Sequence, residues 1–248
     1  MNKIQSFSRY EFKFLLDRKR ANLIEKECRF FMKYDENINK KFDNRYFVRS
    51  LYFDNIFSSN FYEKVDGMKS RKKYRLRTYS KKENLNKPIF LEIKGRSNQR
   101  TYKNRTKINF NDLHIFFDKN KYLDLLKIYG KENLVINSFL FDSYKKNIFP
   151  RVLIDYRRRP YVNKNGLNFR LTFDSQIMSS KTNMLFDKNN SLSWEECRAG
   201  YTVLEVKFER SITPWFHRII QNYDLERLSI SKFVMGIEQS KIAKETSV

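Results

Sequence analysis

The stretch Lys73-Tyr74-Arg75-Leu76-Arg77 alternates basic and apolar side chains without interruption. Successive side chains of a β-strand point to opposite faces, so the three basic residues share one face and the two apolar residues share the other. A face open to solvent ordinarily carries charges of both signs, mixed with uncharged polar residues. Three consecutive cations on one face therefore predict a strand whose polar side lines a positively charged space.

The same two-residue alternation recurs in six further segments. They are residues 9–14, 48–54, 91–94, 103–108, 168–174 and 204–209. In 103–108, Lys103, Arg105 and Lys107 form a second run of three cations on one face. Seven strands, each with one charged and one apolar face, predict a large antiparallel sheet.

Helix signals are modest and fall between these strands. The predicted helices lie at residues 17–33, at 112–129 and from Thr213 onward. The first would place Leu16, Leu23 and Phe30 on one face, and Pro214 suits the first position of the third. Helices that are apolar on one side need a sheet face to cover, so the chain is expected to be α+β.

Two architectures agree with this pattern. One is an antiparallel sandwich with its charged faces in water. The other is a closed barrel whose charged faces line a tunnel and whose apolar faces are covered by helices. The repeated runs of cations favour the barrel.

Composition limits the kind of ligand. The 248 residues include 51 Lys and Arg against 28 Asp and Glu, which gives a formal net charge of +23. An excess of this size favours anionic partners such as phosphate-rich ligands, nucleic acid or acidic lipid. With 40% hydrophobic and 16% aromatic residues the chain is expected to fold rather than remain disordered. No linker or repeat divides it, so residues 1–248 are expected to form one domain.

The location is predicted from what the sequence contains and lacks. Cys28 and Cys197 are the only cysteines, which suits a reducing compartment. The first residues do not have the pattern of a signal peptide, and no run of 18 uncharged apolar residues is present. We therefore expect a cytoplasmic protein without a transmembrane segment.

Three of the strands repeat a Glu-x-Lys motif. These are Glu11-Phe12-Lys13, Glu92-Ile93-Lys94 and Glu205-Val206-Lys207. Residues two apart on a strand project from the same face about 7 Å from each other. This spacing suits a carboxylate that holds Mg²⁺ or Mn²⁺ beside an ammonium that holds a phosphate bridged by that ion. The alternative is a cross-strand ion pair with no ligand.

The expected chemistry is phosphoryl transfer, which depends mainly on positioning and charge stabilisation by the protein. The six glycines are scattered, so no Gly-rich phosphate loop exists, and no side chain stands out as a covalent nucleophile. Both observations disfavour ordinary kinases. Aromatic residues mostly alternate away from the basic faces, which disfavours single-stranded nucleic acid as a partner.

From about Ser8 to Gly236 the sequence resembles the catalytic domain of vacuolar transporter chaperone (VTC) polyphosphate polymerases, a branch of the triphosphate tunnel metalloenzymes. The motifs that carry the resemblance are Arg9-Tyr10-Glu11-Phe12-Lys13, Ser50-Leu51-Tyr52-Phe53-Asp54-Asn55, Tyr74-Arg75-Leu76-Arg77, Leu91-Glu92-Ile93-Lys94, Lys107, Tyr156-Arg157-Arg158, Arg170-Leu171-Thr172-Phe173-Asp174, Leu204-Glu205-Val206-Lys207 and Ser231-Lys232-Phe233.

The resemblance implies an eight-stranded antiparallel tunnel and a set of site residues. The implied catalytic phosphate ligands are Lys13, Arg75, Arg77, Lys94, Lys107, Arg158, Arg170 and Lys232. Tyr156, Ser231 and Lys207 would assist in substrate binding, and Glu205 would hold the metal ion. The run Arg157-Arg158-Arg159 leaves open which arginine enters the tunnel.

The activity implied is transfer of the γ-phosphate of ATP to a growing polyphosphate chain, with Mn²⁺ or Mg²⁺ as cofactor. The fungal relatives also carry a regulatory domain and membrane helices, which this sequence does not show, so a role at a membrane would require a partner. Two alternatives remain at this stage. One is a tunnel hydrolase that cuts triphosphates or tripolyphosphate, and the other is a polyphosphate-binding protein without activity.

Overall fold

Eight strands form one continuous antiparallel path in the computed structural model, which describes residues 10–36, 38–98, 100–187, 189 and 191–244. In path order they are β1 (Tyr10–Asp17), β10 (Tyr201–Phe208), β8 (Phe169–Lys181), β7 (Phe149–Asn163), β3 (Tyr46–Asp54), β4 (Ser70–Thr78), β5 (Ile89–Ser97) and β6 (Arg100–Ile108). Two short strands, β2 (Met32–Tyr34) and β9 (Glu195–Glu196), pair with β7 and β8 and complete a ten-stranded sheet. Ser8 and Arg9, where the resemblance begins, lie outside the described residues.

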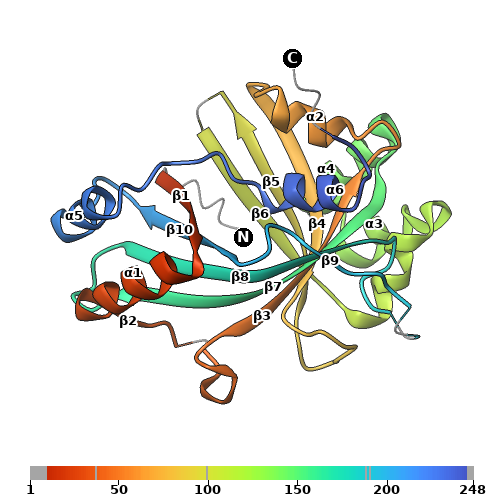
Figure 1. Cartoon of the computed structure of the whole chain (residues 1–248). Helices are drawn as coiled ribbons and strands as arrows, with labels where there is room; N and C mark the ends of the chain where they lie inside the picture. Colours follow the sequence, from red (N-terminus) through yellow and green to blue (C-terminus); the bar gives the residue numbers. More distant parts are fainter. Residues whose placement is uncertain (1–9, 37, 99, 188, 190, 245–248) are drawn as a thin grey trace.

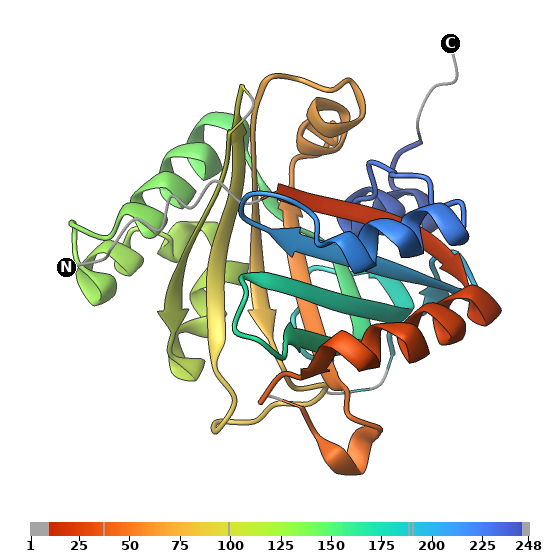
Figure 2. The ribbon, with the colours of Figure 1, turned by 90° about the vertical axis from the view of Figure 1, so that its left-hand side faces the viewer.

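The closed eight-stranded barrel expected from the sequence is not what the structure shows. β1 and β6 end the path, and no backbone pairing joins these two edges within the described residues. The sheet instead curls so that β1 and β10 face β4 and β5 across a trough (Figure 2). Register shifts in β3 at Tyr52/Phe53 and between β7 and β8 at Asp155/Arg157 mark where the strands can bend. The α+β class is confirmed.

Side chains link the two sides of the trough. Nζ of Lys94, on β5, donates to Oε2 of Glu11, on β1, at 3.1 Å. These strands are far apart along the path of the sheet, so the contact shows how strongly the sheet curls. The concave faces of the two arms therefore come within side-chain contact of each other, although the sheet stays open.

Helices cover the convex face of both arms, as expected. On the β3–β6 arm, α4 (Leu134–Lys146) and the 3₁₀-helix η2 (Phe110–Phe117) bury Phe139 and Phe116 against Leu76 and Leu91. On the other arm, α1 (Arg18–Phe31) and α5 (Pro214–Asn222) pack over β1, β10 and β8 (Figure 1). The remaining short helices are α3 (Asp124–Tyr129), η1 (Lys40–Phe42) and η3 (Lys119–Lys121). No helix in the described ranges combines the length and apolarity needed to cross a bilayer.

The predicted helix at residues 17–33 is confirmed as α1, but its predicted apolar face is wrong. Leu23 and Phe30 are 40% and 76% exposed, and the helix buries Ala21, Ile24 and Cys28 instead. Leu16 belongs to β1, so it does not set the rotation of the helix that follows. The helical phase begins at Asp17, whose side chain accepts a hydrogen bond from the backbone N–H of Arg20.

One helix that the sequence pattern did not predict lies on the concave side. α6 (Lys232–Gln239) buries Phe233 and Ile237 together with Ile154 and Tyr156 of β7. The helix α2 (Ser59–Val65) lies beside it. Helix α6 therefore packs against β7 and β8 on the concave side, and its first residue, Lys232, lines the cavity there.

Gly236→Val should destabilise the protein by about 2 kcal/mol. A Cβ at Gly236 would lie 2.7 Å from Cδ1 and 3.0 Å from Cγ1 of Ile154. A branched side chain there must push α6 away from β7, and thermal unfolding should show the loss as a lower midpoint. The double variant Gly236→Val/Ile154→Ala makes room and should recover part of the loss. An unchanged midpoint in the single variant would show that α6 is not tightly packed.

Candidate functional site

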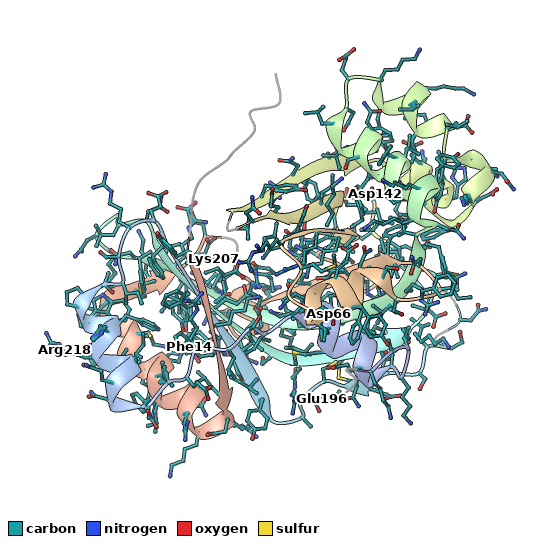
Figure 3. The ribbon with its side chains drawn as sticks, turned by 90° about the horizontal axis from the view of Figure 1, so that it is seen from above. Phe14, Asp66, Asp142, Glu196, Lys207 and Arg218 are labelled. Atoms are coloured by element: carbon teal, nitrogen blue, oxygen red, sulfur yellow. The ribbon has the colours of Figure 1, made fainter. Side chains whose placement is uncertain are left out.

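The concave face encloses a cavity of about 330 Å³. Its walls come from β1, β3, β4, β5, β6, β7, β10 and the start of α6. Nine of the lining side chains are basic, namely Lys13, Lys73, Arg75, Arg77, Lys94, Lys103, Arg158, Lys207 and Lys232. Two lining side chains are acidic, Glu11 and Glu205. In Figure 3, Lys207 lies between the two arms, whereas Phe14 lies on the side of α1 and α5.

Most of the residues singled out from the sequence meet in this cavity. Those that line it are Lys13, Arg75, Arg77, Lys94, Tyr156, Arg158, Glu205, Lys207, Ser231 and Lys232. Lys107 and Arg170 do not line it, and both are exposed. Arg170 borders a separate hollow of about 1190 Å³ at one mouth of the trough, together with Arg105. The alternation pattern identifies which face of a strand a residue lies on. It does not show whether that residue's position along the strand is level with the cavity or beyond it.

The structure places one arginine of the run 157–159 in the cavity. Arg158 points inward and lines it. The guanidinium of Arg157 lies 4.8 Å from the ring centroid of Phe42. Arg159 donates two hydrogen bonds to Glu25 of α1, at 2.7 and 2.8 Å. Arg159 therefore ties β7 to α1, and Arg157 borders the hollow at the mouth of the trough instead of the cavity.

Arg158 belongs to a cluster of two cations and two carboxylates. Its Nε and Nη2 donate to the two carboxylate oxygens of Asp174, each at 2.6 Å, and Nη2 lies 3.2 Å from Glu205. Nζ of Lys232 lies 2.6 Å from Asp174 and 2.7 Å from Glu205. Asp174 is fully buried, so this bidentate pair fixes the arginine in place. The cluster joins β7, β8, β10 and α6 at one point.

The charges of this cluster stabilise one another. Burial alone would raise the pKa of Glu205, but Lys232 and Arg158 outweigh it and hold that pKa well below its ordinary value. Burial would likewise lower the pKa of Lys232, and Asp174 and Glu205 raise it instead. Glu205 therefore remains a carboxylate and Lys232 an ammonium at any pH near neutrality.

Glu92 organises the two arginines of β4, Arg75 and Arg77. Nε of Arg75 donates to Oε2 of Glu92 at 2.8 Å, and Nη1 of Arg75 donates to the hydroxyl of Tyr52 at 2.7 Å. Arg77 donates to the hydroxyl of Tyr156 at 3.1 Å. Burial would raise the pKa of Glu92, but Arg75 and Arg77 hold it well below its usual range. Fixed in this way, both guanidinium groups present donors to the cavity with little loss of side-chain freedom on binding.

Lys73 was not singled out as a site residue, although it lies on the predicted basic face. Its Nζ donates to Oγ of Ser231 at 3.2 Å and lies 5.5 Å from the ring centroid of Phe233. Within the described residues Lys73 forms no ion pair, and burial together with Lys94 and Lys13 lowers its pKa well below the ordinary value. A bound anion would supply the missing partner.

Lys103 should make the binding of anions in the cavity depend on pH. Burial lowers its pKa to about 8, although Glu92 at 2.8 Å opposes the shift. An anion favours the charged ammonium, so binding of tripolyphosphate should weaken by up to about fivefold from pH 8 to pH 9 as Lys103 loses its proton. Calorimetric titrations should show that the affinity of Lys103→Arg for tripolyphosphate lacks this part of the decline between pH 8 and pH 9, because arginine stays charged. Parallel curves for the two proteins would contradict the assignment.

The carboxylates fit a divalent cation only if the substrate supplies most of its ligands. No group of three His, Cys, Asp or Glu side chains suited to a metal ion occurs in the described part of the chain. The carboxylate of Glu205 is buried, and both of its oxygens already form ion pairs, Oε2 with Arg158 and Oε1 with Lys232. Mg²⁺ and Mn²⁺ are commonly held by one or two carboxylates with phosphate oxygens and water. The donor set therefore suits an ion that enters with a polyphosphate and does not suit a metal cage built from protein ligands.

One comparison with a solved structure agrees with the architecture. The chain is similar to a putative adenylate cyclase from Bacillus halodurans, with a TM-score of 0.53 and 11% identity over 89% of this chain and 92% of that chain. It is also similar to the PH1819 protein from Pyrococcus horikoshii OT3, with a TM-score of 0.48 and 12% identity over 93% of this chain and 98% of that chain. At such identities the first likeness shows a shared fold and nothing about activity.

No curated protein matches the sequence significantly. The model of one protein family does match, and its description is the VTC domain. The match extends over residues 8–241, which includes every strand and all of the cavity described above. This protein therefore belongs to the VTC domain family.

Proposed function

We propose that this protein is a metal-dependent polyphosphate polymerase, which transfers the γ-phosphate of ATP to the end of an inorganic polyphosphate chain and releases ADP. The observation that carries the proposal is the cavity itself, whose described lining has nine basic side chains and two acidic ones. Such an excess of fixed positive charge, from side chains already held in place, suits a ligand with several consecutive phosphates. Membership of the VTC domain family supports the same ligand class.

In the proposed reaction, a terminal oxygen of polyphosphate attacks the γ-phosphorus of ATP. A new P–O bond forms, the bond between the γ-phosphorus and the bridging oxygen breaks, and ADP leaves with that oxygen. Arg75, Arg77, Arg158 and Lys232 bind the phosphate oxygens and stabilise the charge on the transferred group. The Tyr156 hydroxyl keeps Arg77 in place through their hydrogen bond.

The remaining residues have supporting roles in the proposal. Lys13, Lys94 and Lys207 hold phosphates further from the transferred group. Ser231, whose Oγ accepts a hydrogen bond from Lys73 at 3.2 Å, assists in binding the substrate. Lys107 and Arg170, which lie outside the cavity, bind outlying phosphates at its mouth. Glu205 would hold Mg²⁺ or Mn²⁺ together with phosphate oxygens, and such an ion would supply neutralisation of charge on the transferred group.

The test is incubation of the purified protein with ATP and Mn²⁺ or Mg²⁺, followed by measurement of ADP, free phosphate and polyphosphate chain length. Chains that lengthen in step with ADP release support the polymerase. Free phosphate without chains would replace the proposal with a tunnel hydrolase. Binding of polyphosphate without any turnover of ATP or tripolyphosphate would leave a binding protein.

A further inference from the structure

Helix α1 exposes large apolar side chains on the side turned away from the sheet. The helix packs on β1 and β10, and it buries Ala21 and Cys28 there. On its solvent side Leu23 and Phe31 are exposed, and Phe30 has 76% of its surface in solvent. Single exposed apolar side chains are common in soluble proteins. Three large ones on one helix of 14 residues form a patch, and such patches mark interaction sites.

Lysines alternate with the apolar side chains along one stripe of α1. Residues spaced i, i+4, i+7 and i+11 project from a helix in nearly the same direction. Lys19, Leu23, Lys26 and Phe30 have this spacing, and all four are exposed. Three further exposed cations flank the stripe, namely Arg18, Arg20 and Arg29. The outer side of the helix therefore combines apolar side chains with an excess of positive charge.

Few carboxylates neutralise this charge. Arg20 lies 3.4 Å from Asp17, and Arg29 lies 3.7 Å from Glu25, which is buried. The remaining acidic side chain of the helix, Glu27, accepts a hydrogen bond from a tyrosine hydroxyl. Neither lysine of the stripe forms an ion pair with another described residue. The positive charge of the stripe is therefore available to an anionic partner.

Helix α5 continues the same surface. It lies beside α1 on the outer side of the arm formed by β1, β10 and β8 (Figure 1 and Figure 2). The rings of Phe31 and Trp215 stack between the two helices, with centroids 4.6 Å apart. α5 contains no acidic residue, and Figure 3 shows its exposed Arg218 pointing outward. We call this surface the α1/α5 face, and its members are Lys19, Leu23, Lys26, Phe30, Phe31, Trp215 and Arg218.

The α1/α5 face is ordered before any partner arrives. Nζ of Lys164 donates to the backbone carbonyls of Arg29 and Phe30, at 2.8 and 3.0 Å. The backbone N–H of Met32 donates to the carbonyl of Cys28. These hydrogen bonds hold the last turn of α1, which carries the exposed rings. A surface that is already ordered loses little conformational entropy when it docks.

The chemistry of the face favours an anionic lipid bilayer. Acidic headgroups attract Lys and Arg, and Phe, Leu and Trp side chains enter the boundary between headgroups and acyl chains. A fluid bilayer also accepts protruding side chains without a matching pocket. A second copy of the chain would bring two positively charged surfaces together. Nucleic acid would need rings with free faces, whereas Phe31 and Trp215 already stack on each other.

We propose that the α1/α5 face docks the protein peripherally on anionic phospholipid membranes. Leu23 and Phe30 insert among the lipids, and Lys19, Lys26 and Arg218 contact the headgroups. The proposal is independent of the proposed function, because no member of the face is among the described lining residues of the cavity. The face lies on the convex side of the sheet, so the cavity stays open to its ligands while the protein is docked.

The test is sedimentation of the intact protein with phospholipid vesicles, without ATP, polyphosphate or metal. One set of vesicles is pure phosphatidylcholine, and the other contains about one third phosphatidylserine, which should bind at least about tenfold more tightly. Phe30→Gln should weaken binding to the anionic vesicles by about tenfold. Lys19→Gln/Lys26→Gln should weaken it by about tenfold or more. All three positions are exposed, so the thermal midpoints should not change.

A second measurement needs no substitution in the face. The sequence has two tryptophans, and Trp194→Phe leaves Trp215 as the only one. Brominated lipids quench a tryptophan that enters the bilayer. The fluorescence of Trp215 should therefore fall when anionic vesicles containing brominated lipid are added. Vesicle binding without this quenching would place the contact elsewhere on the molecule and overturn the proposal.

The matched controls remove similar side chains from other surfaces. Phe57→Gln removes an exposed ring from the turn before α2, and Lys82→Gln/Lys131→Gln removes two exposed lysines. Both controls should bind the vesicles as the unaltered protein does. Equal losses in the control and face variants would reduce the effect to general charge or apolarity and overturn the proposal.

Three further outcomes decide between occupants and functions. No binding to the anionic vesicles at physiological ionic strength would overturn the proposal. A dimer in solution that Phe30→Gln dissociates would assign the face to a second copy and overturn it as well. Vesicle binding through this face by a protein that does not turn over ATP would support the docking face and refute the polymerase, and the reverse result would do the opposite.

Discussion

Glu205→Gln is expected to lower the rate of ATP-dependent polyphosphate synthesis by about 100-fold or more, because it removes the carboxylate proposed to hold the metal ion. The amide has nearly the same shape and can still accept a hydrogen bond from Lys232, which lies 2.7 Å from Oε1. Asp174 continues to neutralise Lys232 and Arg158. The variant should therefore fold, and its loss should be one of catalysis.

A second measurement on this variant separates catalysis from binding. Without metal, Glu205→Gln should bind tripolyphosphate at least as tightly as the unaltered protein, because one negative charge has left a basic cavity. The control is Glu226→Gln, which changes an exposed carboxylate outside the cavity and should alter neither property. Full turnover in Glu205→Gln would remove this residue from the metal site.

Arg158→Met is expected to lower the free energy of unfolding by about 3 kcal/mol and to abolish synthesis. The substitution removes both hydrogen bonds to the buried carboxylate of Asp174 and leaves Lys232 as its ion-pair partner. Denaturant unfolding measures the stability, and the ADP assay measures the activity at a temperature where the variant remains folded.

The double variant Arg158→Met/Asp174→Asn distinguishes the two roles of Arg158. With the buried charge gone, most of the lost stability should return. Activity should not return, because the phosphate ligand is still missing. A double variant that regains activity would show that Arg158 acts only by neutralising Asp174, and one that stays unstable would show that the pair does not behave as a unit.

The sequence predicts the faces of the strands better than their arrangement in space. The alternation in residues 73–77 and 204–209 assigns Arg75, Arg77 and Glu205 to a common concave surface, and the structure brings all three together. The alternation does not reveal that the sheet remains open, because closure depends on how strongly the strands bend at irregular points such as Tyr52/Phe53. A periodic pattern contains no information about such bends.

The same limit explains which site residues were missed. Lys73 and Lys103 lie on the predicted basic faces and line the cavity, so the pattern contained them, but nothing ranked them above Lys107, which lies outside it. Asp174 lies on the polar face of the alternating segment 168–174, yet its bidentate pairing with Arg158 depends on how β7 and β8 lie together. Lys232 was identified through the family resemblance alone, since α6 is too short to give a clear helical period.

A crystal structure of the protein with tripolyphosphate tests the central claim most directly. The concave cavity is the largest concentration of fixed cations described above, and its arginines are already held by Glu92 and Asp174. We expect phosphate groups within hydrogen-bond distance of Arg75, Arg77, Arg158 and Lys232, which is the central claim. Tripolyphosphate bound only on the outer surface, with no phosphate in contact with these four residues, would contradict it.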